Sequence, residues 1–146
     1  MKKFLKKNFR FVLAGALGVT LLAGVNMVAK ASNDNYGYAF MLQPKHYNTY
    51  TDLRYRQTKH DDNPWKVNLK YSEEGKGTIA TFWIEGIFDG RFFMGSKTHN
   101  VKQGSGNHYY NANSIARQTK VKLGAENNNY STNSYYISGY WDEETW

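Results

Sequence analysis

The stretch that most constrains the fold of this chain runs from Trp65 to Ser72. Apolar or aromatic residues at positions 65, 67, 69 and 71 alternate with polar residues at positions 66, 68, 70 and 72. A period of two is that of a β-strand with one buried face. Pro64 stands just before the stretch, where its missing N–H disturbs a sheet least. The chain must therefore build a sheet and a core that covers this face.

A second strand is predicted close behind the first. Thr78–Ile84 is rich in β-branched and aromatic residues, and the intervening Glu73–Gly77 is polar and contains two glycines. Two strand-like runs separated by such a break are typical of an antiparallel hairpin. We therefore expect Trp65–Ser72 and Thr78–Ile84 to pair with each other at the centre of a small β domain.

Further strand-like segments recur along the rest of the chain, separated by turn residues. They are Tyr36–Leu42, Tyr50–Gln57, Ile87–Met94 around an Asp89-Gly90 turn, Ser96–Gln103, Ser114–Leu123 and Tyr135–Trp141, with His108–Asn113 as either a loop or an edge strand. No long amphipathic helix is predicted beyond residue 31. This spacing predicts an all-β fold, a small antiparallel β-sandwich or flattened barrel of about seven or eight strands.

Residues 1–31 have the three-part pattern of a secretory signal peptide. A basic segment, Met1–Arg10, precedes an apolar run, Phe11–Val25, and small residues follow at Ala29 and Ala31. We expect a helical signal peptide to precede the β domain. A retained N-terminal anchor is the alternative, although the apolar run is shorter than the roughly 20 residues that a membrane span needs.

Cleavage is expected between Ala31 and Ser32. The remaining residues 32–146 would then form a single secreted β domain, which is extracellular, with association with the cell surface as the alternative. Six of the 19 Lys and Arg residues lie in residues 1–31, which contain no Asp or Glu, so the net charge falls from +7 to +1. Nucleic-acid binding needs an excess of basic residues. We therefore expect no nucleic-acid partner, and no stable membrane span in the mature chain.

The chain contains no cysteine, which excludes disulfides, thiolate metal sites and a cysteine nucleophile. Its histidines do not have the spacing of metal ligands, and no phosphate-binding loop or nucleophile elbow occurs. The sequence pairs no carboxylates for glycoside hydrolysis. We therefore expect no cofactor and no metal, and we assign no catalytic residue. Should the protein nevertheless be an enzyme, we would expect a small secreted hydrolase that uses Glu85 or a histidine.

Aromatic side chains and asparagine are abundant in residues 32–146, which hold 12 Tyr, 4 Trp, 5 Phe and 13 Asn. Such residues fill and connect a small β domain, and they also suit contacts with sugars and peptides. The predicted binding residues are Trp83, His99, His108, Tyr109, Tyr110, Tyr140 and Trp141. For Trp83 and Trp141, burial in opposing sheets is the alternative. Asp142–Trp146 is expected to form an acidic tail, with Trp141 and Trp146 as the more exposed tryptophans.

Two parts of the chain resemble known secreted proteins. Gly95–His99, the Gly- and Asn-rich stretch after it and the final Tyr135-Tyr136 resemble the small cysteine-free bacteriocins of the lactococcin type, over residues 95–141. About 60 residues before them have no counterpart there. The whole chain resembles an uncharacterised family of small secreted proteins from Gram-positive bacteria. The segments that carry this second resemblance are Arg54–Thr58, Asn63–Val67 and Gly139–Glu144.

The first resemblance implies a β-sandwich that acts on the cell envelope of related bacteria, and the second implies export without an assigned activity. Together with the signal peptide and the aromatic composition, they predict a secreted bacterial protein that binds a cell-envelope component. A cell-wall precursor or a surface glycan is the expected partner, and the activity would be bacteriocin-like. The alternative is a carbohydrate- or wall-binding surface module that is not toxic.

Overall fold

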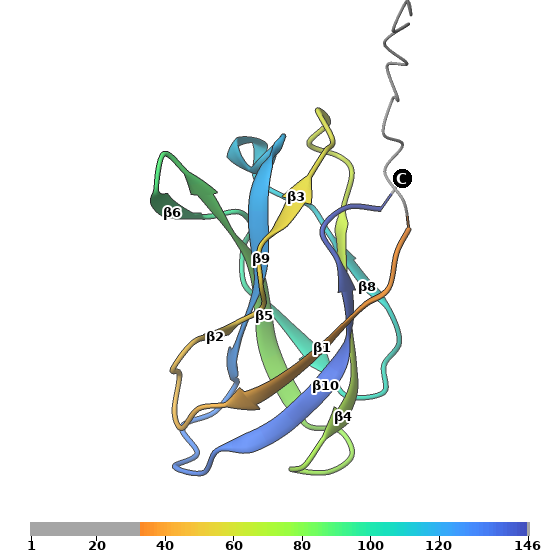
Figure 1. The fold of residues 1–146 in the computed structure, drawn as a ribbon. Coiled ribbons are helices and arrows are strands. Elements are labelled where there is room, and N and C mark those ends of the chain that lie inside the picture. The colour runs from red at the N-terminus through yellow and green to blue at the C-terminus, as the bar shows by residue number, and fades with distance from the viewer. Residues whose placement is uncertain (1–32, 146) are drawn as a thin grey trace, which may run out of the picture.

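Residues 33–145, which the computed structural model describes, form two antiparallel sheets that face each other (Figure 1). The strands are β1 (Tyr36–Leu42), β2 (Thr49–Tyr50), β3 (Arg54–Arg56), β4 (Trp65–Ser72), β5 (Ile79–Phe88), β6 (Arg91–Met94), β7 (His99–Lys102), β8 (His108–Tyr110), β9 (Thr119–Asn127) and β10 (Tyr135–Asp142), with a short 3-10 helix, η1 (Ser114–Ala116). The predicted all-β fold with antiparallel sheets is confirmed. The predicted signal peptide and its cleavage site lie outside the described residues, as does Trp146.

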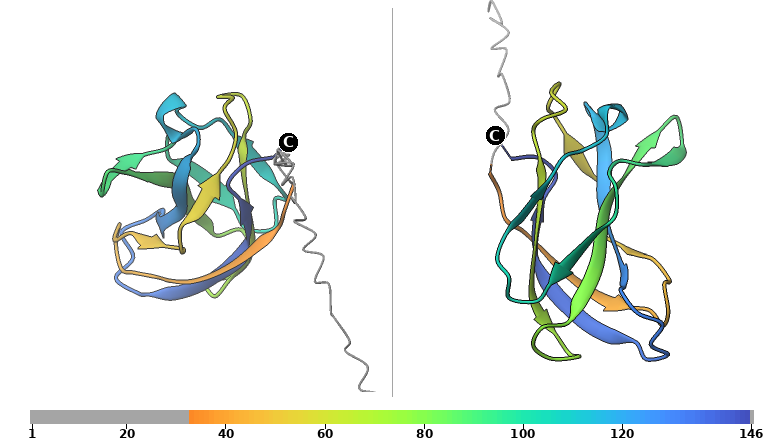
Figure 2. Two further views of the ribbon diagram at one scale, coloured as in Figure 1. Left: turned by 45° about the horizontal axis from the view of Figure 1, so that its top comes forward. Right: turned by 180° about the vertical axis from the view of Figure 1, so that it is seen from behind.

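One sheet, called sheet A here, has the strand order β1-β10-β4-β8. The other, sheet B, has the order β2-β9-β5-β6. Two further strands pair with other parts of the central strands: β3 pairs with the first residues of β9, and β7 pairs with the first residues of β5. Figure 2 shows the two layers with the top tilted forward and from behind. Within the described part of the chain, no helix is both long enough and apolar enough to cross a membrane.

The predicted hairpin at the centre of the domain is wrong in its pairing. Both strands exist, but β4 pairs with β10 and β8 in sheet A, whereas β5 pairs with β9, β6 and β7 in sheet B. Each strand turns its apolar face toward the same core from opposite sides. The segment between them is therefore a crossover between sheets, which in a sandwich lie about 10 Å apart.

The core lies between the inner faces of the two sheets, where strand alternation places the apolar side chains. Its fully buried members include Leu42, Trp65, Val67, Leu69, Phe82, Ile84, Val101, Val121, Leu123, Ile137 and Trp141. The predicted apolar face of β4 supplies Trp65, Val67 and Leu69 to the core.

Trp141 on β10 also belongs to this core and is 1% exposed. This tryptophan is therefore buried in its sheet, as the alternative interpretation expected, and it is not an exposed residue of a tail.

The predicted second strand, Tyr50–Gln57, is split into β2 and β3 by Thr51–Leu53. Its arginine face points inward, because Arg56 is fully buried while Tyr55 on the other face is half exposed. This division accounts for part of the increase from the expected seven or eight strands to the ten that residues 33–145 contain. His108–Asn113 contributes another, since β8 is an edge strand of sheet A.

The predicted acidic tail is buried instead of solvated. The Glu143 carboxylate accepts hydrogen bonds from Arg54, with Nε at 2.6 Å and the η2 nitrogen at 3.2 Å. Arg56 donates to the carbonyl oxygens of Glu143 and Asn63. The Glu144 carboxylate accepts from the backbone N–H of residues 57 and 58 at 3.0 and 2.6 Å. These partners make burial of the charges tolerable.

Candidate functional site

A cavity of about 400 Å³ opens beside the edge strand β8. Its lining combines aromatic rings, amide side chains and one ammonium group: Lys97, His99, Tyr109, Tyr110, Asn111, Ala112 and Asn113. Three of the seven predicted binding residues are in this set, and we call this cavity the β8 cavity. It is the place where the structure gathers the largest share of the predicted residues.

A stacked ring pair builds one wall of the β8 cavity. His99 comes from β7 in sheet B and Tyr110 from β8 in sheet A, and their ring centroids lie 3.7 Å apart at an angle of 10°. The buried Trp65 packs beside both rings, at 5.2 Å from Tyr110 and 6.0 Å from His99. The stack therefore joins the two sheets at their edges and rests on the core, which holds the ring faces in place.

His108 lies next to Tyr110 on the same face of β8, although it is not among the residues that line the β8 cavity. Its ring lies 6.1 Å from that of Tyr110 at an angle of 17°, and its Nε2 atom is 2.7 Å from the hydroxyl oxygen of Ser105. Residues 108 and 110 share a face of the strand, whereas Tyr109 between them points to the other face. The predicted residues around β7 and β8 thus fall in one region, and three of them, His99, Tyr109 and Tyr110, line the β8 cavity.

Burial keeps the two stacked rings of the β8 cavity in their uncharged forms. Burial lowers the pKa of His99, and the nearby ammonium of Lys97 lowers it further. Burial raises the pKa of the Tyr110 hydroxyl. The imidazole and the phenol therefore offer uncharged hydrogen-bonding groups beside their ring faces. Together with the neighbouring amide side chains, such a surface suits a polyhydroxylated ligand.

Tyr140 lies on the outer face of sheet A and is connected to the start of β8. Its hydroxyl donates to Oδ1 of Asn107 at 2.7 Å and accepts from Nδ2 of Asn68 at 3.1 Å. The ammonium of Lys70 lies 5.5 Å from its ring centroid. Tyr140 thus positions the loop before His108, and it is not among the residues that line the β8 cavity.

Trp83 lies on the outer face of sheet B, away from both other aromatic regions. Its indole lies across Gly124 on β9, where a Cβ atom would come within 2.4 Å of the ring. Tyr50 packs edge-on against it with a centroid distance of 5.9 Å. Only 3% of Trp83 is exposed, so its ring faces are covered by protein.

Glu85, the residue considered for a hydrolase, is neighbour to this cluster and already has two partners. Its carboxylate accepts a hydrogen bond from the Tyr50 hydroxyl at 2.8 Å and forms an ion pair with Lys122 at 2.9 Å. Glu126 on the same face lies four residues along β9 from Lys122. The contacts of Glu85 with Tyr50 and Lys122 give its carboxylate a structural role on the outer face of sheet B.

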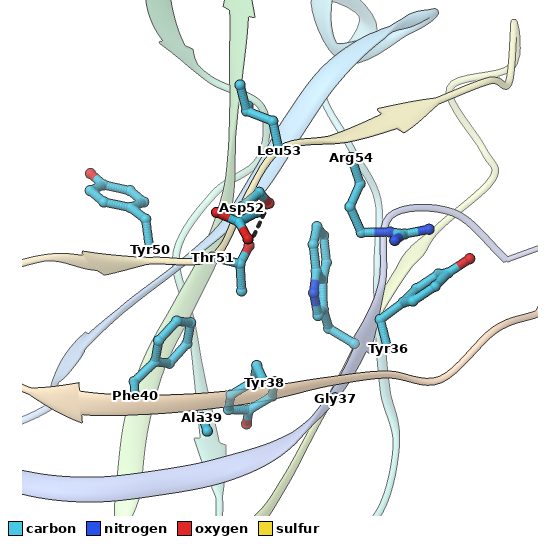
Figure 3. Close-up of a pocket in the computed structure, with 11 residues that line it drawn as sticks. Tyr36, Gly37, Tyr38, Ala39, Phe40, Tyr50, Thr51, Asp52, Leu53 and Arg54 are labelled. Carbon is cyan, nitrogen blue, oxygen red and sulfur yellow. Dashed lines mark hydrogen bonds between the residues drawn. The ribbon is translucent and has the colours of Figure 1, made fainter.

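A second cavity, of about 470 Å³, lies in the seam between the edge of sheet A and the edge of sheet B (Figure 3). We call it the seam cavity. Strand β1 and the chain from Tyr50 to Arg54 form its sides, and Trp141 is among the residues that line it. The Arg54 guanidinium stacks on the Tyr36 ring at 3.0 Å and is held there by Glu143. Sequence reasoning did not identify this cavity, because its walls come from strands of different sheets.

The amide residues of the β8 cavity were also missed by sequence reasoning. Asn111 and Asn113 lie just after β8 and line this cavity. Asparagine is so common in the turns of this chain that these two residues could not be distinguished from ordinary turn residues by sequence. Asn113 is held by its side-chain N–H, which donates to the carbonyl of Met94 at 2.9 Å. Within residues 33–145, no three His, Asp or Glu side chains are placed together to hold a metal ion.

The fold and its cavities define a two-sheet β protein with an aromatic cavity at one edge. The chain belongs to the DUF2712 family, described as a protein of unknown function, whose model matches residues 25–145. No curated protein matches the chain significantly. This membership agrees with the predicted uncharacterised family, whereas the resemblance to bacteriocins stays a prediction.

One solved structure with a similar chain path is described as the crystal structure of PirA. It aligns with 77% of this chain and 98% of its own, at 14% sequence identity and a TM-score of 0.44. A likeness this distant transfers no property of PirA to this chain.

Proposed function

We propose that this is a secreted protein that binds a glycan of the bacterial cell envelope, and that the β8 cavity is its binding site. The observation that carries the proposal is the stacked pair of His99 and Tyr110 beside the exposed amides of Asn111 and Asn113. Sugar rings have apolar faces that pack on aromatic rings, and their hydroxyl groups require both donors and acceptors. Neutral rings and amide groups supply these together.

The proposal predicts that binding depends on rings of this cavity and not on tyrosines elsewhere. The protein would be incubated with washed Gram-positive cells and with purified wall polysaccharide, and the bound fraction measured against concentration. Tyr109→Ala and His99→Ala are each expected to weaken binding by about 3- to 10-fold, since an aromatic contact contributes about 0.5–1.5 kcal/mol.

Tyr55→Ala is the matched control, because Tyr55 is a half-exposed tyrosine of β3 that does not line the β8 cavity. It should bind as the unchanged protein does. Equal losses in Tyr55→Ala and Tyr109→Ala would contradict the assignment of the site, as would binding that survives both changes in the cavity.

The same preparations test whether binding is toxic. Added to growing cultures of several Gram-positive species, a bacteriocin-like protein would stop growth of the species to which it binds. Binding without inhibition would instead favour a wall-binding surface module. Inhibition that persists in Tyr109→Ala after binding is lost would separate toxicity from the proposed site.

A further inference from the structure

Strand β1 has one edge in the sheet and one edge beside the seam cavity. It is the terminal strand of sheet A and pairs with β10 along its whole length, from Tyr36 opposite Trp141 to Leu42 opposite Tyr135, without a break in register. A terminal strand presents alternate N–H and C=O groups that its sheet does not use.

The hydrogen bonds of Tyr136 decide the orientation. Its N–H donates to the Glu73 carboxylate at 2.6 Å and its carbonyl accepts from the Glu73 N–H at 2.9 Å, so both main-chain groups point toward the β4 side. Met41 is opposite Tyr136, and therefore the two form a non-hydrogen-bonded pair. The main-chain groups of Met41 thus point away from β10, and its carbonyl accepts from the Thr49 hydroxyl at 3.3 Å.

Because alternate residues of an antiparallel strand share an orientation, Gly37 and Ala39 also direct their N–H and C=O groups away from β10. Both residues line the seam cavity, and both are exposed. Their side chains are the smallest available, so no bulky group shields this edge. Native sheets usually protect such an edge with charge, proline or a bulge.

The two ends of this open edge are closed by protein contacts. At one end the Thr49 hydroxyl bonds to Met41, and at the other the Arg54 guanidinium covers Tyr36. Between them lie five residue steps of β1, or about 17 Å. The cavity there has an aromatic floor that includes Tyr38, with Thr51 and Asp52 across from β1 (Figure 3). The seam cavity is therefore a slot bordered by an unpaired strand edge.

We propose that the seam cavity binds an extended peptide segment of about three or four residues, which adds to the edge of β1 as a further strand. Main-chain amides repeat with the spacing that Gly37 and Ala39 require. Alternate side chains of the peptide would pack on the aromatic floor. The charge at the rim selects a basic residue, because Asp52 is exposed whereas Arg54 is already paired with Glu143. This site is separate from the β8 cavity.

The test uses a capped tetrapeptide of alternating valine and lysine, acetylated and amidated, with the isotope-labelled protein. Saturable binding is expected to shift the amide resonances of Gly37 and Ala39 and to slow their hydrogen exchange. The same peptide with N-methyl groups on alternate residues keeps its side chains but lacks the amides along one edge. It should bind about 10-fold or more weakly, since it loses two hydrogen bonds.

A matched pair of variants tests the edge itself. Ala39→Pro removes the N–H that faces the cavity, whereas Ala39→Val changes the side chain and keeps it. The proline variant should bind the peptide about fivefold or more weakly, and the valine variant within about twofold of the unchanged protein. Circular dichroism would verify that both variants fold.

Three results would overturn the proposal. They are the absence of a saturable shift at Gly37 and Ala39, equal affinity for the N-methylated peptide, and shifts confined to β8. The comparison of the two peptides needs only the unchanged protein, so it decides the matter even if Ala39→Pro does not fold. Loss of glycan binding at the β8 cavity in Tyr109→Ala would leave peptide binding unchanged.

Discussion

The C-terminal segment Asp142–Thr145 and the tip of the β5–β6 hairpin place charge and apolar surface in opposite ways. Three consecutive acidic residues of the first are 1–7% exposed. In the second, Phe88 and Phe92 are 72% and 55% exposed. From residue polarity alone, one would expect the acidic segment at the surface and the phenylalanines in the core. What decides between them is whether neighbouring elements offer partners.

The C-terminal segment finds partners on β3 and on the chain that follows it, which provide two arginines and two backbone N–H groups. The hairpin projects from one side of the molecule, as the position of β6 in Figure 1 shows, and its two phenylalanines are left in contact with solvent. Its turn is well formed, with Asp89 at φ 49° and Gly90 at φ 73°, as a two-residue type I′ hairpin requires. Charge is therefore buried where it is paired, and apolar surface is exposed where the sandwich ends.

The largest expected effect comes from removing the arginine that holds the C-terminal segment. Arg56→Met should lower the free energy of unfolding by about 3–5 kcal/mol, because the carbonyls of Glu143 and Asn63 lose their donor inside the protein. Urea unfolding monitored by tryptophan fluorescence would measure it. Arg117→Met is the control, since Arg117 forms an exposed pair with Asp61 that contributes less than about 1 kcal/mol. Equal losses in the two variants would mean that the buried guanidinium of Arg56 stabilises the fold no more than the exposed one of Arg117.

A smaller loss is expected when one buried carboxylate loses its charge. Glu144→Gln should cost about 1.5–3 kcal/mol, because its oxygens accept from the N–H groups of Gln57 and Thr58 and hydrogen bonds to charged groups are the stronger ones. Asp62→Asn, at an exposed position, provides the comparison in the same unfolding assay. A Glu144→Gln variant as stable as Asp62→Asn would mean that the buried charge is not stabilising.

Asp142 supplies a test that depends on pH. Burial raises the pKa of its carboxyl group from 3.8 to about 7, against the opposing effect of Lys66. The folded protein therefore binds a proton that the unfolded chain releases, and stability increases as pH falls through 7 toward 4. Between pH 8 and pH 6 the gain should be about 1.4 kcal/mol relative to Asp142→Asn. Parallel pH profiles for the two proteins would show that Asp142 does not carry this dependence.

The smallest effect is expected at the exposed hairpin. Phe88→Ser should change the free energy of unfolding by no more than about 0.5 kcal/mol, since little of this side chain leaves water on folding. Thermal unfolding would measure the change, with Phe82→Ser in the core of the same strand as a control that loses several kcal/mol. A large loss in Phe88→Ser would show that the tip is covered in solution.

The period of two in the sequence was enough to locate most strands. Tyr36–Leu42 and Trp65–Ser72 were predicted with the bounds that β1 and β4 have. Pairing could not be predicted in the same way, because alternation reveals that a face is buried and not which sheet buries it. The acidic tail was misread for a similar reason, since Arg54 lies 89 residues before Glu143. A local pattern contains no information about a partner so far away.

The candidate site was predicted in its aromatic members and not in its geometry. Tyr110 and His99 were both selected for their side-chain chemistry, but their stacking requires two sheets that meet at β7 and β8. The seam cavity was not predicted at all. It depends on the register between β1 and β10, which fixes the direction of the main-chain N–H and C=O groups. That direction cannot be predicted from the residue types of the strand.

The place of β10 in sheet A has a consequence for the order in which the protein folds during synthesis. This strand, nearly the last segment of the chain, lies between β1 and β4, and its residue Trp141 pairs with Tyr36 more than a hundred positions earlier. Sheet A therefore cannot be completed until β10 has been synthesised, because β10 connects β1 to β4. Such distant contacts also make folding slow. The topology thus makes the closing of sheet A a late step, after both β1 and β4 have been made.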